Sequence, residues 1–216
     1  MMEERVSAQL SLLLSRYPAL APLRGEIAAA YELLRDCFEA GGKVLIGGNG
    51  GSCADAEHIV GELMKGFKLP RRLPDAEQAA LRAVDGELGA DLCAHLQGGL
   101  PAIALSSHPS LNTAYLNDVS GEEMYAQQLH VLGRPGDVFL GISTSGNAKN
   151  VRYAAIAAKA KGMKVIALSG KTGGALKALA DINLIMPSDE TYQIQELHLP
   201  VYHCLCLMLE QHFFGA

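Results

Sequence analysis

The sequence Gly141-Ile142-Ser143-Thr144-Ser145-Gly146-Asn147 is rich in glycine and hydroxyl side chains and separates two different patterns. The run 137–140 before it is typical of a buried strand, and residues 148–155 after it have the composition of a helix. When a strand, a loop and a helix follow one another in this order, the unpaired N–H groups at the start of the helix lie beside the loop. The local sequence is consistent with an anion-binding turn and, equally, with an ordinary Ser/Asn-capped helix.

A second loop of the same kind favours anion binding for both. Gly47-Gly48-Asn49-Gly50-Gly51-Ser52 follows the strand pattern 43–46 and precedes a helix that we expect from Cys53 onward. Its four glycines permit positive φ angles and a close approach of the main chain to a ligand. Ser52 is predicted to cap the helix, with Asp55 completing a capping-box-like pair.

The loops do not match the common nucleotide motifs. A dinucleotide-binding fingerprint would need a third glycine where Cys53 stands, and no acidic residue follows at the expected distance. Gly170-Lys171-Thr172 ends like a Walker A loop, but Val165 occupies the required upstream glycine position. The sequence therefore predicts a small phosphate ester as ligand and no nucleotide cofactor.

Composition and charge narrow the class of protein. The 216 residues are 49% hydrophobic and 19% charged, which fits one globular domain over residues 1–216. The net charge of −5 argues against non-specific nucleic-acid binding. Five scattered cysteines favour a reducing compartment. Since no leader pattern and no apolar run of about 18 residues occurs, we expect a cytoplasmic protein without membrane association.

Helix and strand patterns alternate along the chain. Residues 1–40 predict N-terminal helices, broken near Tyr17-Pro18. The strands are apolar on both faces, as parallel strands between two helical layers should be. They are expected at 43–47, 101–106, 136–142, 164–169 and 182–187. The final helix, 191–213, is apolar nearly all round, so we expect it to be buried and to form a homo-oligomer interface with the N-terminal helices.

Candidate chemical groups occur on two of the predicted helices. His58 and Glu62 are four residues apart, which suits either metal binding or proton transfer. The final helix contains Gln195 and His203, with Pro200 between them expected to kink the helix and turn His203 towards Gln195. His198 lies on another face and is interpreted as a packed core or interface residue. Asn117-Asp118 could hold a substrate hydroxyl or simply form a turn.

Taken together, these motifs resemble the sugar isomerase (SIS) domain family, and within it the phosphoheptose isomerases. The resemblance implies an α/β fold: a flavodoxin-like three-layer αβα sandwich with a five-stranded parallel sheet, its N-terminal helices extending the interface. It also implies a homotetramer with active sites at subunit interfaces. The implied reaction converts sedoheptulose 7-phosphate to glycero-manno-heptose 7-phosphate through an enediol, within heptose biosynthesis. A non-catalytic phosphosugar-binding protein, acting as sensor or interaction factor, is the alternative.

The resemblance assigns roles to individual residues. It implies Glu62 as general base and His203 as general acid, and a zinc ion on His58, Glu62, Gln195 and His203. A zinc-bound carboxylate is a poorer base, so the two roles of Glu62 compete. The implied substrate-binding residues are Asn49, Gly50, Gly51, Ser52, Glu62, Asn117, Asp118, Ser143, Thr144, Ser145 and Gln195.

Three features depart from the family pattern. The short loop before Gln195, where Asp or Arg is common, reads Thr191-Tyr192-Gln193. Ala148 stands where a further phosphate-loop serine is common, which removes one hydroxyl. Residues 68–100 form an extra helical segment that contains Lys68, Arg71, Arg72 and Arg82, close to Lys65. This insertion is interpreted either as a solvated charged helix or as a basic lid over an anionic substrate.

Overall fold

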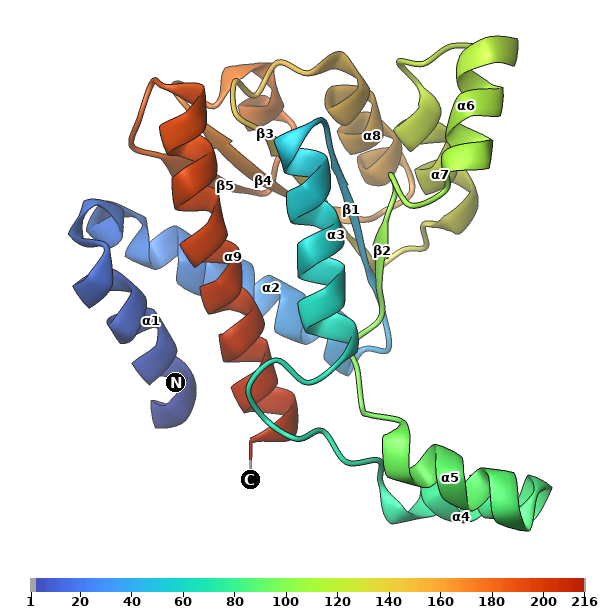
Figure 1. Cartoon of the computed structure of the whole chain (residues 1–216). Coiled ribbons are helices and arrows are strands. Elements are labelled where there is room, and N and C mark those ends of the chain that lie inside the picture. The colour runs from blue at the N-terminus through green and yellow to red at the C-terminus, as the bar shows by residue number, and fades with distance from the viewer. Residues whose placement is uncertain (1–2, 216) are drawn as a thin grey trace.

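Five parallel strands form one sheet in the order β2-β1-β3-β4-β5 in the computed structural model, which describes residues 3–215 (Figure 1). The strands are β1 Val44–Gly48, β2 Ala102–Ala104, β3 Val138–Ser143, β4 Lys164–Gly170 and β5 Ile182–Met186. All five lie within a few residues of the predicted positions. The order is that of flavodoxin-like sheets, in which ligands bind at the carboxyl ends of the strands beside the point where the chain reverses direction across the sheet.

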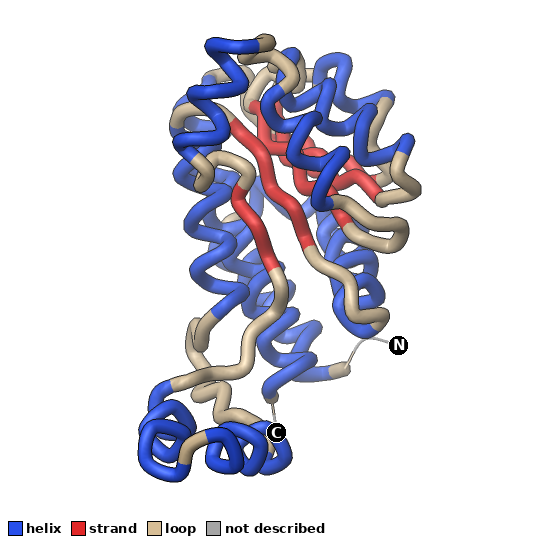
Figure 2. Tube along the Cα trace, turned by 90° about the vertical axis from the view of Figure 1, so that its right-hand side faces the viewer, coloured by secondary structure: helices blue, strands red, loops and turns tan. Residues whose placement is uncertain are grey.

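Alternate strand residues pack against two helical layers, as Figure 2 shows for the sheet between its helices. In β3, Leu140 and Ile142 face one core, whereas Phe139 faces the other. The first layer contains α1 Glu4–Arg16, η1 Pro18–Leu23, α2 Arg24–Glu39, α3 Gly51–Met64 and α9 Thr191–Phe214. The second contains α7 Met124–Leu132, α8 Lys149–Ala160 and η2 Gly174–Ala178. The predicted three-layer sandwich is therefore confirmed.

The long helix α9 is the central element of the first layer. It packs against α1, α2 and α3, and most of its apolar residues are buried, as its composition predicts. Pro200 lies inside this helix, which continues from Thr191 to Phe214. His198 is fully buried, with Nε2 3.3 Å from the carbonyl oxygen of Ser169. This confirms His198 as a packed core residue.

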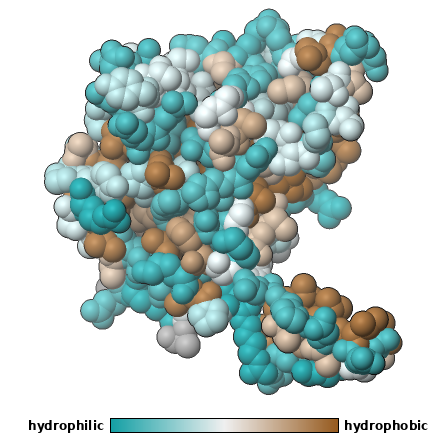
Figure 3. Space-filling model, in the orientation of Figure 1, coloured by the Kyte–Doolittle hydropathy of each residue, from teal (hydrophilic) through white to brown (hydrophobic). Residues whose placement is uncertain are grey.

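The insertion at 68–100 is a hairpin of two helices, α4 Asp75–Val84 and α5 Gly86–His95, and it projects from the body (Figures 1 and 2). An antiparallel bridge between Arg72 and Gln97 closes its base. Apolar side chains remain exposed on it, including Val84 at 90% and Leu88 at 65%, and Figure 3 shows the corresponding hydrophobic surface.

The hairpin does not have the position required of a lid over the glycine- and serine-rich loops of its own chain. It lies at the amino-terminal end of the sheet, whereas those loops follow the carboxyl ends of β1 and β3 (Figure 1). Arg71 is also not a free surface cation, because it is 2% exposed and paired with Glu210. The basic-lid interpretation is therefore wrong for these loops of the same chain, because the hairpin lies at the other end of the sheet (Figure 1) and one of its four cations, Arg71, is buried in an ion pair.

No helix within residues 3–215 is long and apolar enough to cross a membrane.

Candidate functional site

The two predicted loops meet at the carboxyl edge of the sheet. Strands β1 and β3 are neighbours, with Gly47 opposite Gly141 and Gly48 opposite Ile142, so the loops that follow them lie side by side. Together they line a cavity of about 360 Å³, hereafter the loop cavity. Its lining residues are Asn49, Gly50, Gly51, Ser52, Ile142, Ser143, Thr144, Ser145, Ala148, Thr191 and Gln195.

The first loop turns into α3 through its backbone. Gly50 is the N-cap residue and has φ +55°. Ser52, predicted to cap the helix, instead lies inside the first turn and is 4% exposed, and no side chain caps this helix. The cap prediction is wrong by two residues because glycine reaches the left-handed region without strain. A side chain at Gly51 would collide with Gln195, whose Nε2 lies 2.6 Å from the Cβ position.

The second loop is held by its own hydroxyl groups. The Oγ of Ser145 accepts a hydrogen bond from the N–H of Asn147 at 3.2 Å, and the Oγ of Ser143 accepts one from Ala148 at 3.5 Å. A hydroxyl that accepts in this way keeps its own proton for donation to a ligand. Helix α8 begins directly after Ala148 and has no side-chain cap, so its N-terminus faces the same cavity. The arrangement is suited to an anion.

A residue outside both motifs joins the two loops. The side-chain amides of Asn49 and Asn150 exchange hydrogen bonds of 2.9 and 2.8 Å. Asn150 lies in the first turn of α8. Nothing in the sequence marks Asn150, because an asparagine early in a helix has no distinctive pattern. Only the pairing of β1 with β3 brings it to Asn49.

His58, Glu62 and His203 form a second group, between α3 and α9. The Nε2 of His58 lies 3.2 Å from Oε1 of Glu62 and 3.4 Å from Nε2 of His203. Lys65 contacts the other carboxylate oxygen of Glu62 at 3.3 Å. Burial lowers the pKa of His203, and the neighbouring His58 lowers it further, while Glu62 acts in the opposite direction. His203 is therefore held towards its neutral form.

Tyr202 contacts the Nδ1 side of the His58 ring, and Asp55 contacts Tyr202. The Tyr202 hydroxyl lies 3.2 Å from Oδ1 of Asp55 and 3.1 Å from Nδ1 of His58. Burial raises the pKa of Tyr202 strongly and also raises the pKa of Asp55. If the hydroxyl donates to the carboxylate, Nδ1–H of His58 donates to the hydroxyl oxygen. The remaining nitrogen, Nε2, then points to Glu62 and His203.

The structure separates the four residues predicted as metal ligands. Gln195 lines the loop cavity beside Gly51, whereas His203, two turns further along α9, contacts His58. Within residues 3–215, no three or more His, Cys, Asp or Glu side chains are arranged to hold a metal ion. The predicted four-ligand set is therefore not assembled.

Asn117 and Asp118 also lie apart from both groups. They end α6 Pro109–Asp118, a helix with no buried residue, and their side chains are exposed and hydrogen bonded to each other at 2.8 Å. Neither lines the loop cavity.

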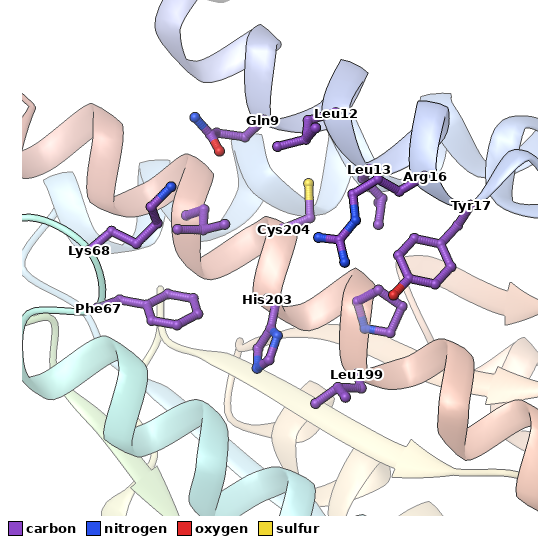
Figure 4. A pocket seen from close by; sticks show the side chains of 12 residues that line it. Gln9, Leu12, Leu13, Arg16, Tyr17, Phe67, Lys68, Leu199, His203 and Cys204 are labelled. Carbon is purple, nitrogen blue, oxygen red and sulfur yellow. The ribbon is translucent and has the colours of Figure 1, made fainter.

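His203 also borders a second cavity, of about 350 Å³, between α1, α9 and the chain at 67–68. Figure 4 shows His203 between Phe67 and Leu199, with Arg16, Tyr17 and Lys68 around the same space. The sequence alone does not associate the α1 residues with His203, since they are far from the motifs along the chain. The chain thus contains a cavity suited to an anion and a separate cluster of two histidines and a glutamate, His58, Glu62 and His203.

Comparison with known proteins shows a consistent set of relatives. The family model of the SIS domain matches residues 75–170. The chain is 40% identical over 193 residues to a phosphoheptose isomerase of Geotalea daltonii, covering 89% of this chain and 87% of the relative. It is 41% identical over 195 residues to one of Trichlorobacter lovleyi, with coverages of 90% and 86%.

A solved structure gives the same result. The phosphoheptose isomerase of Neisseria gonorrhoeae superimposes with a TM-score of 0.73 at 33% identity, over 96% of this chain and 98% of that one.

Proposed function

The chain belongs to the phosphoheptose isomerase family, and on this basis we propose that it interconverts sedoheptulose 7-phosphate and glycero-manno-heptose 7-phosphate. It is an aldose–ketose isomerase built on the SIS fold. The observation that best supports the substrate is the loop cavity, where uncapped helix termini and free hydroxyl protons converge on one anion-sized space. The sensor alternative is not favoured, because the relatives that share 33%, 40% and 41% identity with the chain over most of its length are phosphoheptose isomerases.

In the proposed mechanism, Glu62 removes the proton from C1 of the ketose while His203 gives a proton to the carbonyl oxygen at C2. The resulting enediol collapses to the aldose when O1 loses its proton and C2 receives one. His58 and Lys65 lie beside the Glu62 carboxylate, at 3.2 and 3.3 Å from its two oxygens. The lowered pKa of His203 keeps its ring neutral, so the proton that it gives to the carbonyl oxygen is the N–H proton of a neutral imidazole. The phosphate, fixed in the loop cavity, orients the sugar for these transfers.

Deuterium incorporation tests this function. With sedoheptulose 7-phosphate in D₂O, NMR should show an aldoheptose 7-phosphate labelled at C2. Glu62→Gln should abolish the labelling while inorganic phosphate still binds to the loop cavity. An enzyme that keeps exchanging after this substitution would remove Glu62 as the base, and a wild-type protein without any exchange would remove the proposed reaction.

We further propose that the active site is shared between chains of a homotetramer. Ser52 and Glu62 are ten residues apart on α3, which corresponds to about 15 Å along the helix axis. An extended heptose phosphate has eight bonds from C1 to phosphorus and measures roughly 10 Å at backbone-like bond spacing. This difference supports a substrate that bridges the loop cavity of one chain and the His58, Glu62 and His203 group of another. The exposed Asn117 and Asp118 would then complete a site formed with a second chain.

We propose that His58, Glu62 and His203 bind zinc once their side chains reorient, since as they stand the described residues form no metal-binding group of three or more His, Cys, Asp or Glu side chains. The separations of 3.2 and 3.4 Å are close to the roughly 3.3 Å between ligands of a tetrahedral zinc ion with bonds of about 2.0–2.1 Å. Tyr202 and Asp55 supply the outer hydrogen bonds that orient a histidine ligand. When bound, zinc would polarise the substrate carbonyl. Gln195 does not fit this set, because it lies in the loop cavity.

Elemental analysis after dialysis against buffered zinc should find about one zinc per chain in the wild type and little in His58→Ala. Equal retention by both proteins would contradict the assignment. Because zinc binding and the base role of Glu62 compete, the deuterium experiment should be repeated with a chelator.

A further inference from the structure

Arg71 and Glu210 form an ion pair that is completely enclosed by the protein. Their side chains are both 0% exposed, and Nε of Arg71 lies 3.0 Å from Oε1 of Glu210. Replacing such a pair by apolar residues is often neutral or stabilising, because removing two charges from water costs more than the attraction returns. Stability alone therefore does not account for the pair, and its remaining contacts indicate what it positions.

The guanidinium of Arg71 closes the end of α3. Its Nη1 donates to the carbonyl oxygen of Leu63 at 2.6 Å, and its Nη2 donates to that of Glu62 at 2.9 Å. Carbonyls in the last turn of a helix have no partner within the helix, and a cation there is favourable. The ring of Phe214 lies 4.6 Å from the guanidinium carbon. The backbone of Glu62, the proposed base, is thus bound directly by Arg71.

The carboxylate of Glu210 holds the chain that follows α3. It accepts the N–H of Phe67 at 2.7 Å and the N–H of Lys68 at 2.9 Å. The ring of Phe67 in turn lies against His203, with 5.3 Å between ring centroids. Glu210 and His203 are also seven residues apart on α9, two turns along the same face. The proposed acid is therefore connected to Glu210 through Phe67 and through the helix.

We propose that Arg71 and Glu210 are positioning residues, which set the distance between the proposed base Glu62 and the proposed acid His203. The inference rests on the proposed function, since it assigns the pair to the same proton transfers. One ion pair joins α3, α9 and the intervening chain, so a change in its geometry alters both groups together. The loop cavity, at the opposite end of α3, does not contact the pair.

Arg71→Lys tests the proposal, because lysine keeps the charge but cannot reach Glu210 and both carbonyls as a planar fork does. We expect kcat to fall about 10–100-fold, as for other outer-shell substitutions, while KM for the heptose phosphate stays within about twofold. Glu210→Asp, which keeps the charge and shortens the side chain, should have the same effect.

Lys43→Met is the matched control. Lys43 forms a second, largely buried ion pair with Asp137 at 2.6 Å, which joins the starts of β1 and β3 and, among the described residues, has no hydrogen bond to Glu62, His203, Arg71 or Glu210. The Lys43→Met substitution should lower the melting temperature without changing kcat at temperatures where the protein is folded. An unchanged kcat in Arg71→Lys would overturn the proposal. A fall in kcat that parallels the loss of melting temperature to the same extent in Arg71→Lys and Lys43→Met would also overturn it.

A spectroscopic readout keeps the proposal testable if the wild-type protein does not isomerise heptose phosphates. Long-range ¹H–¹⁵N spectra report the imidazole nitrogens of His58 and His203 at a fixed pH. These signals should shift in Arg71→Lys and Glu210→Asp and remain in place in Lys43→Met. Unshifted signals in the first two variants would overturn the positioning role, whereas shifted signals without activity would reject only the proposed reaction.

Discussion

Asn49 and Asn150 exchange two side-chain hydrogen bonds, of 2.9 and 2.8 Å, and so connect the loop after β1 to the first turn of α8. The two halves of the loop cavity come from segments that are 101 residues apart in the chain. Their relative position determines whether the backbone amides and hydroxyls of both loops can reach one ligand. We therefore expect the amide pair to determine how well the loop cavity binds an anion, and Asn49 also lines that cavity.

Asn150→Leu should weaken binding at the loop cavity without altering the chemical step. A hydrogen bond contributes about 0.5–1.5 kcal/mol, so we expect KM for the sugar phosphate to rise roughly 3–10-fold while kcat changes little. Steady-state kinetics and titration with inorganic phosphate measure both effects. Asn183→Leu, in β5 and away from the cavity, is the control. Equal phosphate affinity in wild type and Asn150→Leu would contradict the role of the pair.

Gly146→Ala should unfold the second loop. Gly146 has φ +66°, and a Cβ atom there would lie 1.9 Å from the carbonyl oxygen of Gly173. The collision involves backbone, which cannot move aside cheaply, so we expect a loss of more than about 2 kcal/mol in unfolding free energy. Gly25→Ala, in helix α2 with nothing within 4 Å of its Cβ position, should instead stabilise the protein by about 0.5–1 kcal/mol.

Urea denaturation measures both variants. A Gly146→Ala protein as stable as the wild type would show that the loop has another conformation.

The buried His198 should make stability depend on pH. Burial lowers its pKa from 6.5 to about 4, and its Nδ1 has no hydrogen-bond partner among the described residues. Above pH 6.5 the histidine is neutral in both folded and unfolded chains, so it has no effect. As the pH falls from about 6.5 to about 4, only the unfolded chain gains the proton, and stability falls by up to about 3 kcal/mol.

Urea denaturation between pH 7.5 and 4.5 tests this. His198→Gln should lessen the loss of stability, whereas substitution of the exposed His130 by Gln should not. An identical pH dependence in wild type and His198→Gln would contradict the assignment.

If the active site is shared between chains, two variants that are inactive alone should regain activity when they are combined in one oligomer. Ser145→Ala disables the loop cavity, and Glu62→Gln disables the proposed base. If each site combines the cavity of one chain with the base of another, co-expressed mixed oligomers contain some sites with both groups intact. We therefore expect isomerase activity in the mixture well above the sum of the separate variants.

The oligomeric state should be checked by light scattering on the same samples. A mixture that forms hetero-oligomers without regaining activity would place the complete site within one chain.

Much of the fold could be predicted from local pattern. Strands such as β3, apolar on both faces, indicate a parallel sheet between two helical layers, because only such a position buries both faces. The two loops could be placed at one edge for the same reason, since parallel strands end on one side. The apolar composition of α9 likewise predicted its burial.

Tertiary contacts decided the rest. In the sequence, Arg71 is a charged residue that would be expected at the surface. Only its contact with Glu210, 139 residues away, allows its side chain to be buried. Gln195 and His203 share a helix and a motif, yet α9 brings one to the loop cavity and the other to His58.

Local sequence thus determined the sheet, its helices and the edge at which the two proposed anion-binding loops lie, because burial and backbone freedom are properties of short segments. The tertiary structure alone decided which charges are paired and which chemical groups meet, because those depend on distances between segments that sequence spacing does not fix.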